Sequence, residues 1–319
     1  MFRVAILDDY QRVARSLADW DSLRPRAQVE FFHDNLVDLP RLADRLQSFE
    51  AVVAMRERTP FPRALFERLP NLRLLVTAGM RNASIDLAAA TGRGVLVTGT
   101  ETLATPTAEL TWALILALSR NLVHEANGMR SGLWQTTVGH VIAGKTLGVL
   151  GLGKLGSQVA ALGKAFGMQV LAWSQNLTAE KASEAGAVYA TKEELLETSD
   201  IITIHLVLSE RTRNLIGAPE LARMKPTALL INTSRGPIVN ETALLEALAK
   251  RRIAGAAIDV YDQEPLPADH PLRKAGNLLL TPHLGYVVEE NYRMVYGCAV
   301  EDIRAFLDGK PVRAINQLG

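Results

Sequence analysis

The segment from Gly144 to Gly156 constrains the fold of this chain more than any other stretch. Its first part, residues 146–150, is a short apolar run typical of a buried parallel strand. Three glycines follow with G-x-G-x-x-G spacing, and residues 154–166 then show the apolar periodicity of a helix. A strand, a glycine-rich turn and a helix in this order predict a βα unit that binds the diphosphate of a dinucleotide.

Each glycine of this turn has its own physical role. Gly151 allows the backbone to turn sharply after the strand, Gly153 leaves room for a pyrophosphate, and Gly156 allows the helix to pack closely on the sheet. The helix N-terminus at Lys154 and Leu155 offers unpaired N–H groups to phosphates. We therefore expect these five residues to bind a dinucleotide; the alternative is a glycine-rich turn without a ligand.

Apolar strand-like runs alternate with helical stretches along the whole chain. This alternation predicts βαβ units, and hence an α/β protein with two doubly wound parallel sheets. An apolar helix at residues 104–120 should be buried between domains or subunits, and residues 128–144 suit an irregular connection. The expected strands are 3–8, 29–32, 51–55, 72–77, 95–98, 146–150, 169–173, 201–205, 228–232, 253–259 and 277–281, and the other expected helices are 13–20, 36–46, 62–69, 179–185, 192–198, 218–224, 241–250 and 287–307.

Composition excludes several classes of protein. The formal net charge of +1 argues against a nucleic-acid-binding surface. The apolar runs are too short for a signal peptide or a membrane helix. Cys298 is the single cysteine, so neither an internal disulfide nor a cysteine metal cluster can form. We expect a cytoplasmic protein with no metal, no nucleic acid and no membrane as partner.

Three residues that could carry chemistry follow successive expected strands. Arg235, Glu264 and His283 stand at carboxyl ends of strands, where a doubly wound fold places its ligands. An arginine can hold a carboxylate through two N–H groups and polarise the adjacent carbonyl. A histidine can exchange the proton that accompanies a hydride, and a glutamate beside it would favour the imidazolium. Taken singly, each could be an ordinary loop residue; the three together predict a catalytic trio.

In five segments the chain resembles the D-isomer-specific 2-hydroxyacid dehydrogenase family. The resemblance covers most of residues 100–290, in the family's order and spacing, and the first hundred residues match only loosely, through residues 77–86. The matching segments are GVLGLGKLG at 148–156, IHLVLSERT at 204–212, INTSRGPIV at 231–239, AIDVYDQEP at 257–265 and TPHLG at 281–285.

This resemblance implies an architecture and a set of site residues. It implies a flavodoxin-like substrate domain, residues 1–99 and 286–319, into which a Rossmann cofactor domain, residues 100–285, is inserted. It implies a homodimer, and the apolar helix after Ala104 is a candidate for the contact between subunits. It also implies that Arg235, Glu264 and His283 are catalytic, that Thr233 and Asp259 contact the nicotinamide, that Thr107, His205 and Leu206 contact the cofactor, and that Arg56, Gly79 and Met80 bind the substrate together with Arg235.

Two positions depart from the family pattern. Ser174 stands after the second cofactor-domain strand, where the family commonly has an aspartate for the adenine ribose. Without that carboxylate a 2′-phosphate is tolerated, which slightly favours NADP and leaves NAD open. Tyr286 occupies a position where small residues or tryptophan are common, so it bears on the size of the substrate.

The expected reaction is hydride transfer between a nicotinamide and C2 of a small 2-oxo or 2-hydroxy acid of the D series, such as glyoxylate or hydroxypyruvate. Three alternatives stay open. The same trio could act on phosphite or on phosphoglycerate. A protein of another class, a nucleotide-sensing corepressor, would keep the fold and the cofactor without turnover.

Overall fold

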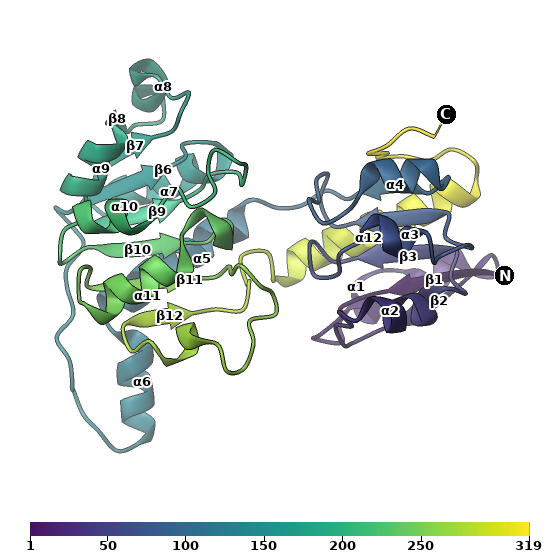
Figure 1. Ribbon diagram of the computed structural model, residues 1–319, viewed down its shortest axis with the longest axis horizontal. Helices are drawn as coiled ribbons and strands as arrows, with labels where there is room; N and C mark the ends of the chain where they lie inside the picture. The colour runs from purple at the N-terminus through teal and green to yellow at the C-terminus, as the bar shows by residue number, and fades with distance from the viewer. Residues whose placement is uncertain (319) are drawn as a thin grey trace. The chain divides into compact units, whose positions relative to one another are not determined.

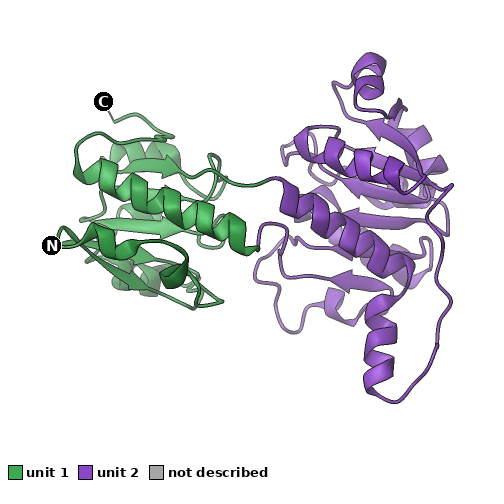
Figure 2. Ribbon diagram, turned by 180° about the vertical axis from the view of Figure 1, so that it is seen from behind, with its two compact units in different colours: residues 1–103, 288–319 green, residues 104–287 purple. Residues whose placement is uncertain are grey.

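The structure is a computed structural model that describes residues 1–318, and it divides into two compact units (Figure 2). Unit 1 comprises Met1–Leu103 and the C-terminal segment from Val288, and unit 2 comprises Ala104–Val287. The boundaries expected after residues 99 and 285 lie a few residues before these. The second unit is therefore inserted into the first, because unit 1 is built from both ends of the chain.

Unit 1 is a five-stranded parallel sheet with helices on its faces (Figure 1). The strand order β2-β1-β3-β4-β5 reverses between β1 and β3, which is the flavodoxin-like pattern. The strands are β1 (Phe2–Ile6), β2 (Ala27–Phe31), β3 (Ala51–Ala54), β4 (Leu74–Thr77) and β5 (Leu96–Gly99), and the helices are α1 (Ala14–Leu17), α2 (Leu39–Leu46), α3 (Arg63–Phe66), α4 (Leu87–Gly92) and α12 (Glu289–Leu307), with a 3-10 turn η1 (Trp20–Leu23).

Unit 2 is a seven-stranded parallel sheet with the order β12-β11-β10-β9-β6-β7-β8. The order reverses between β6 and β9, the point at which a doubly wound sheet opens a crevice for a ligand. The strands are β6 (Thr146–Leu150), β7 (Gln169–Trp173), β8 (Val188–Tyr189), β9 (Ile201–Ile204), β10 (Leu229–Asn232), β11 (Gly255–Ile258) and β12 (Leu278–Leu280); the helices are α5 (Thr105–Ser119), α6 (Leu122–Arg130), α7 (Lys154–Ala165), α8 (Ala179–Glu184), α9 (Lys192–Thr198), α10 (Ala218–Arg223) and α11 (Glu241–Ala249), with 3-10 turns η2 (Gly236–Ile238) and η3 (Pro271–Lys274).

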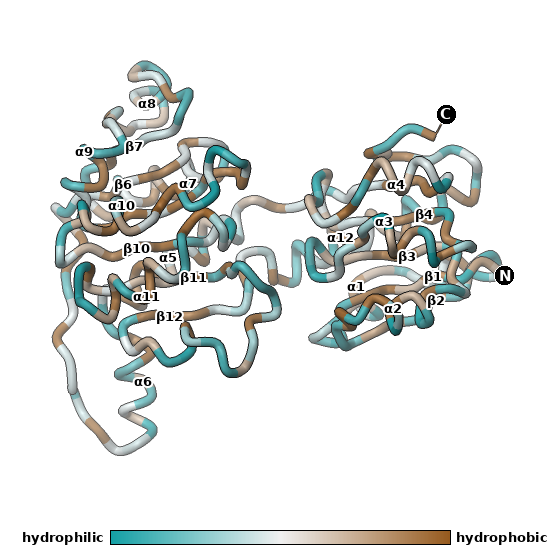
Figure 3. Tube along the Cα trace, viewed as in Figure 1, coloured by the Kyte–Doolittle hydropathy of each residue, from teal (hydrophilic) through white to brown (hydrophobic). Residues whose placement is uncertain are grey.

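The strands are apolar because both faces of each sheet are covered by helices. All four residues of β3, β4, β9 and β11 are buried, and the apolar colouring of Figure 3 follows β10 and its neighbours. The predicted α/β class with two parallel sheets is confirmed. Within residues 1–318 no helix is both long and apolar enough to span a membrane, and no group of three acidic, histidine or cysteine side chains could hold a metal ion.

Helix α5 is buried for a different reason from the one expected. It packs on β10, β11 and α7 inside unit 2, and Trp112 stacks on Phe166 with ring centroids 4.7 Å apart. The Trp112 indole N–H also donates to the carbonyl oxygen of Val159 at 3.2 Å. The expectation that this helix needs a second domain or subunit to be buried is therefore wrong for the face that carries Trp112.

Two helices were not anticipated from the sequence. Residues 87–92 form α4, although LAAATG lacks a clear amphipathic pattern; Asp86 caps this helix by accepting a hydrogen bond from the N–H of Ala89 at 2.8 Å. Helix α6 extends into the stretch expected to be irregular, and the irregular connection begins after Arg130. The cap supports α4, whereas α6 has no side-chain cap at its N-terminus and packs against α5.

A buried carboxylate attaches the C-terminal segment of unit 1 to its sheet. Asp302 on α12 has no exposed surface, accepts a hydrogen bond from the Thr98 hydroxyl at 3.0 Å, and pairs with Arg313 at 2.7 Å. Burial raises the pKa of Asp302 to about 6 in spite of the guanidinium. The folded protein therefore binds this proton more tightly than the unfolded chain does.

We expect this carboxylate to make stability depend on pH. Its contribution is fully present below about pH 4, where the unfolded chain is also protonated, and is lost as the pH rises to about 6. A rise of the Asp302 pKa from 3.8 to about 6 corresponds to a loss of roughly 2–3 kcal/mol in the free energy of unfolding when this carboxyl ionises. Urea unfolding from pH 4 to 7 should show the stability difference between wild type and Asp302→Asn shrinking or reversing as the pH rises. The exposed control Asp308→Asn should show no such trend, and a pH-independent difference for Asp302→Asn would contradict this account.

Candidate active site

The glycine-rich turn after β6 has the geometry that a dinucleotide requires. Gly151 adopts φ +101°, and a Cβ there would lie 2.7 Å from the carbonyl oxygen of His205. A Cβ on Gly156 would lie 1.9 Å from the carbonyl oxygen of Gly151, so helix α7 can approach the turn only because that atom is missing. A Cβ on Gly153, in contrast, meets nothing within 4 Å.

The N-terminus of α7 is therefore open at the position where a diphosphate would bind. Gly153 is the N-cap residue, and no side chain caps the helix there, so the first N–H groups have no side-chain acceptor. A Cβ at Gly153 would occupy open space in front of these donors. The turn thus fits a dinucleotide, with Lys154 and Leu155 in its first helical positions.

His205, at the end of β9, faces the same turn across the point where the strand order reverses. Burial lowers the pKa of its imidazole to about 3, so the ring is neutral near pH 7. Its Nε2 lies 2.9 Å from the Thr203 hydroxyl, whereas its buried Nδ1 has no hydrogen-bond partner within residues 1–318. A buried polar atom without a partner next to the glycine turn further supports a ligand in this crevice.

The loop after β10 holds Arg235 in a fixed position. Asn232 donates from Nδ2 to the carbonyl oxygen of Arg235 at 3.0 Å, and the Ser234 hydroxyl donates to the carbonyl oxygen of Leu206. A Cβ on Gly236 would lie 2.1 Å from the carbonyl carbon of Tyr261, so this loop packs directly against the loop after β11. The glycine after the arginine therefore brings two site loops together.

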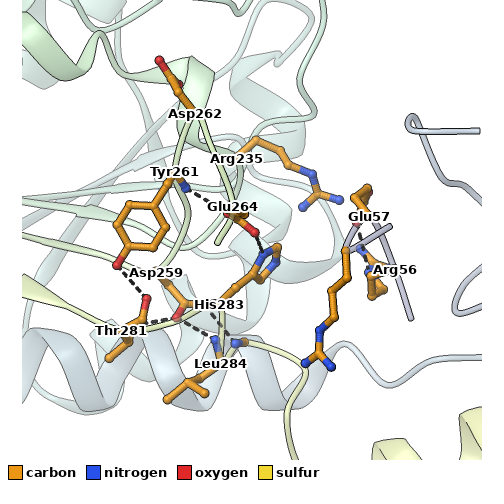
Figure 4. Close-up of polar contacts among 12 residues, drawn as sticks. Arg56, Glu57, Arg235, Asp259, Tyr261, Asp262, Glu264, Thr281, His283 and Leu284 are labelled. Atoms are coloured by element: carbon orange, nitrogen blue, oxygen red, sulfur yellow. Dashed lines mark hydrogen bonds and ion pairs between the residues drawn. The ribbon is translucent and has the colours of Figure 1, made fainter. Parts of the chain in front are cut away.

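Glu264 and His283 form a direct pair between the loops after β11 and β12 (Figure 4). The Nδ1 atom of His283 lies 2.5 Å from Oε2 of Glu264, and Oε1 of Glu264 accepts the backbone N–H of Tyr261 at 2.9 Å. His283 has φ +54°, a left-handed conformation that a β-carbon disfavours and that the surrounding contacts maintain. The pair leaves Nε2 as the ring nitrogen available for proton exchange.

Asp259 organises the loop that carries the histidine. Its side chain is completely buried and accepts hydrogen bonds from the Thr281 hydroxyl at 2.6 Å, the N–H of Leu284 at 2.7 Å and the N–H of Gly285 at 2.9 Å. Burial raises its pKa, although these three donors favour the carboxylate. The structure thus places Asp259 directly beneath the His283 loop.

Smaller contacts complete the wall of the site in unit 2. The Thr107 hydroxyl donates to the carbonyl oxygen of Gly285 at 2.7 Å, and the hydroxyls of Thr111 and Thr233 lie 2.8 Å apart. Tyr286 is buried, and its ring meets the His283 ring edge to face with centroids 5.3 Å apart. Ser174 follows β7 on the other side of the glycine turn.

The remaining predicted substrate residues belong to unit 1 and lie together there. A Cβ on Gly79 would lie 2.8 Å from Nη1 of Arg56, so the guanidinium rests against this glycine. The N–H of Gly79 is already used, because it donates to the Thr100 hydroxyl at 3.0 Å. Met80 is half-exposed beside them. An anion in this turn would therefore meet the Met80 amide, not that of Gly79.

Sequence reasoning missed the groups that hold the catalytic candidates in place. Tyr261 supports Glu264 through a backbone N–H, which carries no sequence signal. Gly236 and Thr111 are ordinary residue types whose importance appears only when their neighbours are known. The Gly-Pro pair after Arg235 was the one local sign of a tight approach.

Comparison with known proteins agrees with this geometry. Residues 112–285 match the NAD binding domain of the D-isomer specific 2-hydroxyacid dehydrogenases. A glyoxylate reductase of Aeropyrum pernix is 42% identical over 264 residues, which cover 79% of each chain. A D-3-phosphoglycerate dehydrogenase of Bacillus subtilis is 36% identical over 320 residues, covering 99% of this chain and 59% of that one. The crystal structure of a phosphoglycerate oxidoreductase from Vibrio cholerae superimposes with a TM-score of 0.93 at 38% identity, covering 97% of this chain and 100% of that one.

The fold and the site together define a nicotinamide-dependent oxidoreductase with a doubly wound cofactor domain. The chain belongs to the D-isomer specific 2-hydroxyacid dehydrogenase family, and it is an oxidoreductase of 2-hydroxy acids.

Proposed function

We propose that this enzyme interconverts a small 2-oxo acid, such as glyoxylate or hydroxypyruvate, and the corresponding D-2-hydroxy acid. The observation that supports this most strongly is the Glu264–His283 pair beside the Arg235 loop, at the carboxyl edge of the sheet that carries the glycine turn. The name of the 42%-identical relative supports glyoxylate within this class.

In this proposal Arg235 holds the substrate through its carboxylate and carbonyl oxygens, because a guanidinium presents several N–H donors in one plane. Unit 1 supplies further donors for the carboxylate, the Arg56 side chain and the Met80 amide, with Gly79 leaving room for them. Tyr286 limits the size of the group on C2 next to His283. These roles make the affinity for the substrate depend on the positive charges of Arg235 and Arg56 and on the shape of the turn at Gly79.

His283 moves the proton. When bound, a reduced nicotinamide supplies a hydride to C2, and the carbonyl oxygen must then gain a proton. Nδ1 of His283 is engaged by Glu264, so Nε2 gives that proton during reduction and takes it back during oxidation. Glu264 orients the ring and favours the imidazolium, and Asp259 fixes the loop on which the ring stands.

We propose that the enzyme uses NAD or NADP, with a slight preference for NADP. Ser174 offers no carboxylate that would repel a 2′-phosphate at the end of β7. Thr233, Thr107 and Leu206 complete the expected cofactor contacts. Parallel fluorescence titrations with NADH and NADPH decide this point, because a much tighter NADH complex would contradict the preference.

A substrate panel tests the proposed reaction. Reduced nicotinamide absorbance should fall with glyoxylate, hydroxypyruvate or pyruvate, and only the D-hydroxy acids should be oxidised. Turnover of 3-phosphoglycerate or phosphite with no turnover of simple 2-oxo acids would assign the trio to another substrate. Cofactor binding with no turnover on any member of the panel would favour a nucleotide-sensing corepressor.

We further propose that the protein works as a homodimer in the cytoplasm. After α6, residues 131–141 are an extended segment whose apolar side chains are exposed, including Trp134 (72%) and Val138 (89%). Such residues on a soluble enzyme usually mark an interface between subunits. Light scattering coupled to size-exclusion chromatography should give the mass of two chains, whereas the mass of one would contradict this.

Gly153→Ala should separate cofactor binding from folding. A Cβ at this position meets no protein atom within 4 Å and φ is −84°, so the melting temperature should stay close to that of the wild type. In the complex the methyl group would take the space of the diphosphate, so we expect the Kd for the cofactor to rise by about tenfold or more. Gly156→Ala is the matched contrast, since its Cβ would lie 1.9 Å from a carbonyl oxygen and should destabilise the fold itself. Unchanged cofactor affinity in Gly153→Ala would place the diphosphate elsewhere.

Glu264→Gln should change the pH dependence of the reaction more than the fold. The amide keeps the shape and can still accept from Tyr261, but it no longer favours an imidazolium at His283. We expect the basic limb of kcat for reduction to move to lower pH, with kcat near neutral pH falling by about 10–100-fold. Glu241→Gln is a matched control, because Glu241 also accepts a backbone N–H of this loop, that of Asp262, and lies 3.6 Å from a different histidine, His270. An unchanged profile in Glu264→Gln would contradict the pairing.

A further inference from the structure

The side-chain amide of Asn82, in the loop after β4, joins two loops at the carboxyl edge of the sheet of unit 1. Its Nδ2 donates to the carbonyl oxygen of Arg56 at 2.7 Å and to the Thr77 hydroxyl at 2.8 Å. Its Oδ1 accepts from the N–H of Ser84 at 2.9 Å and from the Ser84 hydroxyl at 2.6 Å. Both donor positions of the amide are thus used, and its orientation is determined by four contacts.

The contact to Arg56 acts on a strained residue. Arg56 follows β3 with φ +54°, a left-handed conformation that costs free energy for a residue with a β-carbon. The hydrogen bond from Asn82 to its carbonyl oxygen holds the peptide group that this conformation turns toward the β4 loop. Without this hydrogen bond, the left-handed conformation of Arg56 is less stable relative to the other backbone conformations open to it.

The Arg56 side chain depends on this backbone conformation. Nη1 and Cζ of Arg56 lie 2.8 Å and 4.0 Å from the position a Cβ would have on Gly79, which itself has φ +85°. The Arg56 guanidinium therefore lies against the turn at residues 79–81. The N–H groups of Met80 and Arg81, next in that turn, donate to no hydrogen bond within residues 1–318.

We propose that Asn82 is a positioning residue that holds Arg56 and the turn at residues 79–81 together as one carboxylate-binding cradle. The proposal rests on the function proposed above, in which Arg56 and Met80 bind the substrate carboxylate. Asn82 does not touch the substrate. It orders the guanidinium before binding, so that the side-chain entropy of Arg56 is not lost at the moment of binding.

This role predicts an effect on KM and not on the chemical step. Removing the amide should let Arg56 leave the glycine turn, and KM for the 2-oxo acid should rise by about tenfold, with kcat reduced by less than about threefold. The Kd for the cofactor should not change, because the turn at residues 151–156 that is expected to bind it belongs to unit 2.

A double-mutant cycle tests the coupling. Asn82→Ala, Arg56→Ala and the double variant are compared with the wild type by steady-state kinetics on glyoxylate, or on the best acid of the panel. Asn71→Ala is the matched control, since Asn71 also donates to a backbone carbonyl at 2.7 Å in unit 1, that of Gln47. We expect Asn82→Ala to raise KM in the wild-type background and to have little further effect when Arg56 is already alanine.

The two hypotheses fail in different ways. If Arg56→Ala leaves KM unchanged, the proposed substrate contact is wrong, and the role of Asn82 is overturned with it. If Arg56→Ala raises KM but Asn82→Ala raises it by the same factor in both backgrounds, the substrate contact stands and the positioning role is overturned. If Asn82→Ala has the KM of the wild type, the positioning role is likewise overturned.

Asn82→Asp keeps the test valid if the alanine variant folds poorly. The new carboxyl group can donate one hydrogen bond to Arg56 while it is neutral, whereas its ionised form cannot donate at all. The charged side chains on the adjoining β3 loop are Arg56, Glu57 and Arg58, and Arg81 stands next to residue 82 in its own loop. Nε of Arg56 lies 3.6 Å from Oε2 of Glu57, and Nη1 of Arg58 donates to the carbonyl oxygen of Asp8 at 2.7 Å. Because the ordinary pKa of an aspartate is about 3.9, the new side chain is ionised from about pH 5 to pH 8 and cannot donate to Arg56, so KM should be about tenfold above that of the wild type across this range. A KM equal to that of the wild type, in a variant with a normal melting temperature, would overturn the proposal.

Discussion

Replacement of His283 by alanine is expected to lower kcat for 2-oxo acid reduction by about 10²–10⁴-fold, the usual contribution of a positioned general acid. The ring that Glu264 holds at 2.5 Å is lost, and His270 is paired with a different carboxylate, Glu241, at 3.6 Å. The Kd for the cofactor should change little, because the glycine turn follows a different strand. Steady-state and single-turnover kinetics measure the effect.

His270→Ala is the control for this experiment. His270 lies 3.6 Å from Glu241 and caps the short turn η3, and it is not one of the proposed reacting groups, so its loss should leave kcat unchanged. If His283→Ala retained wild-type kcat, the proton would have to come from another group, and the proposed role of the pair would be abandoned.

Replacement of Arg235 by alanine is expected to reduce kcat/KM by about 10³-fold or more, through both a higher KM and a lower kcat. The guanidinium is proposed to hold the carboxylate in the ground state and the developing oxyanion in the transition state, so both parameters depend on it. Arg235→Lys keeps the charge without the planar pair of donors and should recover only part of the loss. Kinetics on the best 2-oxo acid give the two parameters separately.

Arg223→Ala is the matched control, because this arginine makes an exposed ion pair with Glu197 at 2.6 Å on the surface of unit 2. It should not change kcat/KM. If Arg235→Ala raised KM alone, the arginine would bind the carboxylate without acting on the carbonyl oxygen. Wild-type kinetics for that variant would remove it from the site.

Much of the site could be predicted from local sequence, since residues close in the chain already carry their geometry. The spacing of Gly151, Gly153 and Gly156 predicts the turn, and the structure confirms its conformation. The positions of Arg235, Glu264 and His283 after successive strands predict that they share one edge, because the carboxyl ends of parallel strands lie together.

Other features could not be read from the sequence. Asp259 was predicted to touch the nicotinamide, and its side chain is instead surrounded by the donors of the His283 loop, so that contact stays a prediction. The N–H of Gly79 was predicted to bind substrate, yet it is occupied by Thr100, which follows a different strand. Helix α4 depends on an aspartate cap and on packing, and its own pattern is too weak to show it.

The sequence by itself determined the class of fold and the family, and it predicted the reacting groups, because strand periodicity, glycine spacing and residue chemistry are local properties of the chain. Only the tertiary structure decided which backbone N–H groups are occupied, which donors surround Asp259, and how Asn82 joins two loops of unit 1. Those contacts link residues that lie on different strands, and their distances depend on how the intervening segments pack.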